Sequence, residues 1–228
     1  MPPTPERQPR RNPDCIFCKI ADGTAPARQE HLIDDDGRLL SGGNLIAFHN
    51  RLDWARVMLL IIPRAHITQA EFWTTDLLPA AARLATTLGD KKCPEGYRLI
   101  SNFGRIAHQS QEHAHMHLVS GADTDLPATF DGQANILVDQ PPVRITPTAV
   151  PGVPLAVRIT AGGAATQTQL WRGEHFLECG RTAIDYASEH TPEGFRLISN
   201  FHSPTTGHIG GGDAALLLLG GGQLDLYA

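Results

Sequence analysis

A ten-residue segment that occurs twice constrains the fold of this chain more than any other feature. Pro94–Phe103 recurs as Pro192–Phe201, with nine of ten positions identical and an offset of 98 residues in a chain of 228. Self-similarity at a long offset indicates a duplicated structural unit. The sequence therefore predicts two related halves.

The patterns around the two copies also correspond. Before each copy, apolar residues recur at helical spacing, over Asp76–Leu88 with a stop at Gly89 and over Phe176–Ala187. Short apolar runs of strand length occur over 56–62, 118–121, 155–159 and 216–220. Each half is therefore predicted to be an α+β unit with an antiparallel sheet and one main helix.

The composition divides the chain into a tail and two domains. Residues 1–13 are rich in proline and arginine and lack the apolar core of a secretory signal, which predicts a disordered tail. The first domain is expected over 14–124 and the second over 125–228. The proline-rich stretch 139–154 lies in the joining region, where proline would interrupt a central strand.

Charge and hydropathy exclude two classes of partner. A net charge of −5 disfavours a protein that coats nucleic acid, because neutralising phosphates needs a basic face. No apolar stretch approaches the roughly 20 residues needed to cross a bilayer. We expect a cytoplasmic protein that binds no nucleic acid and no membrane, although a local site can still hold a small anion.

Three histidines alternate with apolar residues in His113-Ala-His115-Met-His117. On an extended strand, side chains alternate between faces, so the three imidazoles are predicted to share one face. Taken alone, the triplet also fits a metal site of the kind found in cupin-like barrels, or a chance cluster on a solvated face. Neutral amide and hydroxyl side chains beside imidazoles suit an anionic phosphate instead. Such side chains precede the triplet at Asn102, Gln109 and Ser110.

The segment Asn102–Val119 resembles the signature hairpin of the histidine-triad (HIT) family, in which an asparagine, a glycine-containing loop, Gln-Ser and three alternating histidines follow in this order. Leu59–Ile67 is similar to the family's strand that ends in Pro-basic-x-His-Ile, and Asp14–Ile20 is similar to its opening. The likeness spans about residues 14–121. It implies a HIT-like fold whose two tandem halves pair as a pseudo-dimer.

The resemblance implies a nucleotide hydrolase that acts on a phosphoramidate or phosphoanhydride, such as a nucleoside phosphoramidate or a dinucleoside polyphosphate. His115 is the implied nucleophile, which attacks the α-phosphorus and forms a nucleotidyl-histidine intermediate. His117 is implied to bind phosphate oxygens and stabilise charge in the transition state, with His113 beside the nucleophile. The implied phosphate contacts come from Asn102, Gln109 and Ser110.

Four apolar residues match positions that hold the base in this family, namely Ile16, Phe17, Ile20 and Phe48. For Ile16 and Ile20, plain core packing is an equally good interpretation. The family's Phe-x-Asp, whose carboxylate takes both ribose hydroxyls, reads Phe48-His49-Asn50 here. Because an amide offers no bidentate carboxylate, Asn50 is expected to hold ribose more weakly, which leaves the substrate preference open.

Two alternative functions stay open. In related nucleotidyl transferases a glutamine replaces the third histidine, so by resemblance His117 indicates hydrolysis. The altered Asn50 and the second half favour, as the main alternative, a non-catalytic, regulatory nucleotide-binding protein. A nucleotidyl transferase is the less favoured third interpretation.

Cys15 and Cys18 form a Cys-x-x-Cys pair that supplies two thiolates, whereas a structural zinc needs four ligands. A resemblance to the zinc-bearing bacterial branch of the family implies that His66 and His113 complete the set. The alternatives are a reduced, metal-free pair and a redox pair. We expect a structural zinc and no organic cofactor.

The second half lacks the triad. Gly210–Ala215 stands where the histidines should be, so we predict one active half and one scaffold half. The glycines in this run could instead cradle a phosphate, but they precede a strand, which favours a remnant of a lost site. Because ordinary family members are homodimers, the second half is expected to supply that interface within the chain. The prediction is a monomeric pseudo-dimer with one site for a small nucleotide.

Overall fold

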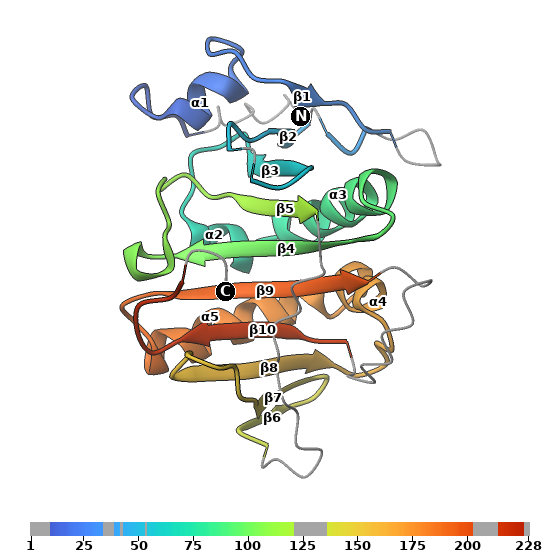
Figure 1. Ribbon diagram of the computed structural model, residues 1–228, viewed down its shortest axis with the longest axis vertical. Coiled ribbons are helices and arrows are strands. Elements are labelled where there is room, and N and C mark those ends of the chain that lie inside the picture. Colours follow the sequence, from blue (N-terminus) through green and yellow to red (C-terminus); the bar gives the residue numbers. More distant parts are fainter. Residues whose placement is uncertain are drawn as a thin grey trace, which may run out of the picture.

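The computed structural model describes residues 10–33, 39–41, 43–52, 54–120, 136–202 and 214–225. Its strands form one ten-stranded antiparallel sheet in the order β1-β2-β3-β5-β4-β9-β10-β8-β7-β6. Helices α2 to α5 lie behind this sheet in the view of Figure 1. The predicted domain boundary at 124/125, the glycine run 210–212 and most of the predicted tail lie outside the described residues.

The first half runs through α1 (Ile16–Ala21), β1 (Gln29–Glu30), β2 (Leu45–His49), β3 (Met58–Pro63), α2 (Gln69–Thr74), α3 (Leu77–Lys92), β4 (Gly96–Phe103), the short 3-10 helix η1 (Arg105–Ala107) and β5 (Met116–Ser120). The second half runs through β6 (Val138–Gln140), β7 (Val143–Pro147), β8 (Leu155–Ala161), α4 (Gln167–Arg172), α5 (Phe176–His190), β9 (Phe195–His202) and β10 (Leu216–Gly220). None of the helices in these described ranges is long and apolar enough to span a membrane.

The sheet has an internal pseudo-twofold axis between β4 and β9. From this centre outward, the strand order is β4-β5-β3-β2-β1 on one side and β9-β10-β8-β7-β6 on the other, so each strand of the first half has a counterpart. The main helices α3 and α5 correspond in the same way. The predicted α+β fold, with two halves that each contribute an antiparallel sheet and a main helix, is confirmed.

The repeated segment pairs with its own second copy. In the β4–β9 ladder, Ile100 lies opposite Ile198, and these two residues are also equivalent in the repeat, so the axis passes between them. Two stacked aromatic pairs flank the axis, Tyr97 with Phe201 (ring centroids 4.4 Å apart) and Phe103 with Phe195 (4.1 Å). Such pairs contribute about 0.5–1.5 kcal/mol each beyond the burial of their area. Symmetric packing of the repeat thus joins the halves.

The two faces of the sheet are covered differently. Along β3, Leu59 and Ile61 face the large core beneath the helices, whereas Leu60 and Ile62 belong to a smaller cluster with α1. The alternation follows the period of two of a strand. The face opposite the main helices is therefore covered by α1 only at one end.

The helix α3 is longer than the sequence predicts, because it continues through Gly89 to Lys92. A Cβ on Gly89 would lie 2.3 Å from Cζ of Tyr97, so glycine is required by the ring that packs against the helix. The predicted stop at Gly89 is wrong for this reason. Close packing, and not helix termination, explains the residue.

The proline-rich stretch 139–154 contributes to the sheet as well as joining the halves. It contains β7 and most of β6, which form a hairpin at one edge. Pro141 and Pro142 lie in the turn between these strands, and Pro147 is the last residue of β7. Proline is thus kept away from the central strands, as its missing N–H requires.

Candidate functional site

A pocket of about 860 Å³ opens on the face of the sheet opposite the main helices. The first half contributes His117 from β5, Asn102 from β4, and Gln109 and Ser110 from the loop between these strands. The second half contributes Arg196 from β9. Side chains that are far apart in the sequence meet here because β4, the neighbour of β5, also pairs with β9.

The three histidines alternate as expected, but only His117 lies within a strand. His113 and His115 precede β5, which begins at Met116. The rings of His115 and His117 lie 5.0 Å apart, and Phe17 contacts His113 and His115 edge-on at 5.8 and 5.4 Å. The strand predicted to contain all three histidines is therefore too long, because β5 contains only the third. The three imidazole rings nevertheless lie in a row.

The His115 ring is held in one tautomer. Its Nδ1 lies 2.9 Å from the carbonyl oxygen of His113, so Nδ1–H donates to that carbonyl. This bond leaves Nε2 without a proton and with a free lone pair. Burial lowers the pKa of His115, whose side chain is almost fully covered. The ring is neutral at pH 7 and therefore able to act as a nucleophile.

His117 is neutral as well. Burial, followed by the nearby His115 and Arg196, lowers its pKa to about 3. A neutral imidazole carries one N–H that can donate to a phosphate oxygen. The positive charge in the pocket therefore comes from arginine and not from the triad.

Gln69, at the start of α2, clamps the backbone of His115 and was not identified from the sequence. Its side-chain NH₂ donates to the His115 carbonyl, and its Oε1 accepts the His115 N–H, both at 2.8 Å. Gln167 at the start of α4 makes the same two bonds to Ala215, at 2.8 and 3.2 Å. Ala215 therefore occupies the position of His115 in the second half. Both glutamines directly follow the threonine of a capping box, a signal that locates the helix starts but not the clamp.

The loop after β4 brings Gln109 and Ser110 to the pocket. It begins at Gly104, where φ is 77° and a Cβ would lie 2.8 Å from the Glu193 carbonyl oxygen, so the close approach requires glycine. The Gln109 side chain accepts the Gly104 N–H at 2.8 Å and donates to the Gln111 carbonyl at 2.9 Å. Gln109 therefore braces its own loop, while the exposed Ser110 lies at the pocket rim.

Asn102 is held by a residue of the second half. Its Oδ1 accepts a 2.8 Å hydrogen bond from Nε of Arg196. The group that Asn102 can offer to an anion is consequently its NH₂. The mirror-image bond joins Nε of Arg98 to Oδ1 of Asn200, also at 2.8 Å. Arg196 was missed in the sequence, although the repeat carries Arg and Asn four residues apart in both copies.

The residues expected to hold the nucleoside lie beside the triad and not in the pocket lining. Phe17, Ile20 and Phe48 are buried in the cluster beneath α1, and Ile16 packs at its margin. The Oδ1 of Asn50 accepts the N–H of Leu52 at 3.3 Å, which closes a local turn. The apolar cluster thus begins where Phe17 touches His115.

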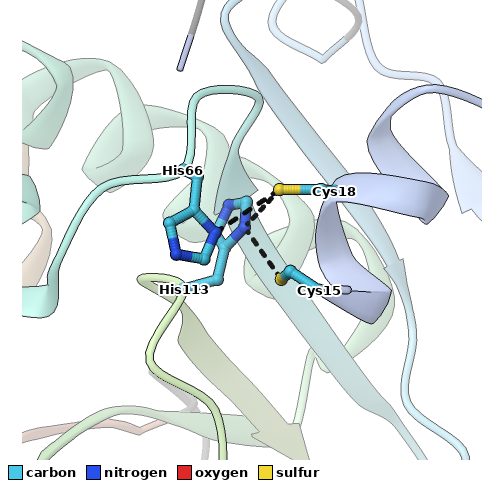
Figure 2. Close-up of side chains that lie close together, drawn as sticks. All are labelled: Cys15, Cys18, His66 and His113. Carbon is cyan, nitrogen blue, oxygen red and sulfur yellow. Dashed lines mark hydrogen bonds between the residues drawn. The ribbon is translucent and has the colours of Figure 1, made fainter. Parts of the chain in front are cut away.

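Cys15, Cys18, His66 and His113 form a cluster whose ligand atoms all lie within 4.8 Å of one another. Figure 2 shows the two cysteines at the start of α1 facing the two imidazoles. Nδ1 of His113 lies 3.5 Å from each sulfur, and Nδ1 of His66 lies 3.4 Å from that of Cys18. Nε2–H of His113 donates to the Pro63 carbonyl at 2.8 Å, which leaves Nδ1 as the free lone pair.

These distances fit a tetrahedral metal. Zn–S bonds of about 2.3 Å and Zn–N bonds of about 2.0–2.1 Å, at a tetrahedral angle, place sulfur and nitrogen about 3.5 Å apart. The cluster matches this separation and offers two thiolates and two imidazole nitrogens. The residues could therefore hold one zinc ion, which would tie α1 to the start of the triad.

Comparison with known proteins agrees with this arrangement. The family model described as HIT domain matches residues 36–124. Adenosine 5'-monophosphoramidase HNT1 of Candida albicans is 32% identical over 117 residues, which cover 48% of this chain and 71% of that protein. The corresponding protein of Schizosaccharomyces pombe, adenosine 5'-monophosphoramidase hnt1, is 29% identical over 109 residues, with coverages of 46% and 72%.

One solved structure is similar over nearly the whole chain. The X-ray structure of a galT-like protein from Arabidopsis thaliana aligns over 96% of this chain and 85% of its own, with a TM-score of 0.62 and 11% identity. At this identity the likeness concerns the fold alone. It indicates that the paired halves form an architecture found in another protein.

The two glutamine clamps allow a matched test of how His115 is positioned. Gln69→Leu leaves the buried N–H and carbonyl of His115 without their side-chain partner, so it should lose about 2–6 kcal/mol of unfolding free energy, summed over two groups. Gln167→Leu leaves the Ala215 N–H without its partner, but Ser199 still donates to the Ala215 carbonyl, so this variant should lose about 1–3 kcal/mol. Only Gln69→Leu should shift the imidazole NMR signals of His115. Chemical denaturation and long-range ¹⁵N–¹H spectra measure the two effects. Equal shifts of these signals in both variants would contradict the assigned role of Gln69.

Proposed function

The chain belongs to the histidine-triad (HIT) family, and on this premise we propose that it is a nucleotide hydrolase that cleaves a phosphoramidate or phosphoanhydride bond through a nucleotidyl adduct on His115. The observation that supports this most is the bond from Nδ1–H of His115 to the His113 carbonyl. It leaves Nε2 as a lone-pair nitrogen on a ring that adjoins His117, which lines the pocket of about 860 Å³.

The proposed reaction has two displacements at the α-phosphorus. In the first, Nε2 of His115 forms a bond to phosphorus while the bond to the leaving nitrogen or oxygen breaks. In the second, water attacks the adduct, the P–N bond to His115 breaks, and a nucleoside monophosphate is released. One water molecule is consumed overall. Because imidazole is a good leaving group when protonated, the same residue serves both steps.

Neutral donors stabilise the charge that develops on the phosphate oxygens. His117 donates its N–H, Ser110 its hydroxyl and Asn102 its NH₂. Gln109 keeps Ser110 in place through the loop bonds described above. Removing one donor of this type typically lowers kcat by about 10²–10³.

The nucleoside is proposed to lie at the α1 end of the triad, with its base against the apolar cluster that includes Ile16, Phe17, Ile20 and Phe48. Asn50 follows Phe48 by two residues and would contact the ribose with one amide oxygen. That oxygen already closes a turn to Leu52. The ribose is therefore held weakly.

A second candidate, a nucleotide-binding protein without useful catalysis, is favoured by this weak ribose position and by the absence of the triad from the sequence of the second half. It predicts binding of mononucleotide with no release of a leaving group. The intact His115 tautomer and its glutamine clamp favour the hydrolase.

The metal proposed for the Cys15, Cys18, His66 and His113 cluster is a structural zinc ion. With four protein ligands it leaves no open position for substrate, so its contribution is to fix α1 and His113. His113 is two residues before the nucleophile, and its carbonyl accepts the hydrogen bond from Nδ1–H of His115. Zinc binding thus supports the geometry of His115 without taking part in the chemistry.

Replacing the nucleophile tests the hydrolase directly. His115→Ala should lower kcat on adenosine phosphoramidate and on a dinucleoside polyphosphate by at least about a thousand-fold, because no other group can form the adduct. Calorimetry should show that AMP still binds within about threefold. His175→Ala, which removes a surface imidazole of the second half, is the control and should leave turnover unchanged. Full activity of His115→Ala, or a wild-type protein that releases no product, would rule out the proposal.

Removing a cysteine tests the metal. Purified protein should contain one zinc per chain by elemental analysis, and Cys18→Ala should lose it. Because binding of a structural zinc is coupled to folding, the loss should lower Tm by about 10 °C or more. Cys93→Ala changes a buried thiol outside the cluster and should retain the metal. The assignment fails if Cys18→Ala still binds one zinc, or if the wild-type protein binds none when refolded with zinc.

A further inference from the structure

Among the residues that line the pocket of the first half, Arg196 comes from the second half. It lies on β9, is only 1% exposed, and donates through Nε to Asn102 and through Nη1 to the Asp225 carbonyl, at 2.8 and 3.0 Å. Burial lowers its pKa to about 10, so the guanidinium remains charged at neutral pH. Its charge also lowers the pKa of His117. A fixed cation from one half therefore acts on the triad of the other.

The two ends of the triad face different chemistry. At the His113 end, Phe17 and the apolar cluster beneath α1 adjoin the rings. At the His117 end, the pocket is lined by three arginines, Arg98, Arg105 and Arg196, together with apolar side chains that include Trp54 and Met58. An apolar end suits a base, and a cationic end suits an anion. The substrate is thereby oriented along the row of histidines.

We propose that Arg196 forms a subsite for the leaving group and selects substrates whose leaving group carries phosphate next to the bond that is cleaved, as in a dinucleoside polyphosphate. This inference rests on the proposed hydrolase function and extends it. It gives the half without a triad a part in substrate recognition.

The chemistry of the first displacement explains why a cation is useful there. When Nε2 of His115 bonds to the α-phosphorus, the electron pair of the breaking P–O bond stays on the bridging oxygen of the leaving phosphate. That phosphate gains a negative charge beside Arg196. The Arg196 guanidinium, whose Nε and Nη1 already donate within the protein, stabilises this charge as a fixed cation in the wall of the pocket. A neutral amine leaving group gains no such interaction.

A purely structural role for Arg196 predicts a different pattern of kinetic losses. The mirror-image bond from Arg98 to Asn200 shows that an Arg–Asn pair also ties β4 to β9. If Arg196 only joined the strands, its loss would lower kcat/KM by the same factor for every substrate. Phe201→Leu removes the stacked pair of Phe201 with Tyr97 across the same ladder, and neither residue lines the pocket, so this variant is the control for loosening of the ladder.

Kinetics on two substrates tests the subsite. For Arg196→Met, kcat/KM on diadenosine tetraphosphate should fall roughly 10- to 100-fold, because the fixed cation near the developing negative charge is lost. On an adenosine phosphoramidate with a neutral amine the fall should stay below about threefold, and Arg196→Lys should recover part of the loss. Phe201→Leu should change kcat/KM on the two substrates by the same factor. Equal losses on both substrates, or no loss on either, would overturn the proposal.

A binding measurement separates this proposal from the proposed function. In the His115→Ala background, diadenosine tetraphosphate should bind about tenfold more tightly than AMP, and Arg196→Met should remove this difference. If the wild-type protein has no turnover but the difference in affinity depends on Arg196, the hydrolase is wrong and the subsite stands. If the difference persists in Arg196→Met, the subsite is wrong whatever the activity.

Discussion

The pairing of β4 with β9 is the interaction on which the rest of this structure depends. The two copies of the repeat lie antiparallel with Ile100 opposite Ile198, so one segment forms both sides of a twofold contact. This ladder extends two five-stranded units into a single sheet and leaves only short strands, β1 and β6, at its edges. Short edges limit further strand pairing between chains. Symmetry that other proteins obtain by dimerisation is here built into one chain.

The two halves joined by this ladder share one framework but differ in their chemistry. Gln69 and Gln167 hold equivalent backbone positions, but the clamped residue is His115 in one half and Ala215 in the other. The second half has kept the groups that shape the sheet. Through Arg196, on the strand that joins the halves, it also places a cation in the pocket of the first.

The sequence predicts the main architecture because the duplication and the helical periodicity can be recognised directly along the chain. That Cys15, Cys18, His66 and His113 lie together was predicted only from the family resemblance. It misplaces the end of α3, since Gly89 serves contact with a ring that follows in the next strand. It also misses Gln69 and Arg196. Their roles depend on which backbone atoms or side chains lie opposite across the fold, and spacing along the chain does not encode this.

Native mass spectrometry with AMP tests most directly the claim that two paired halves form one nucleotide site. The expected spectrum contains a single chain that carries one AMP, since the twofold contact is satisfied internally and only one half has the triad. A particle of two chains would show that the repeat does not complete the interface. A single chain that carries two AMP molecules would show that the second half has kept a site of its own.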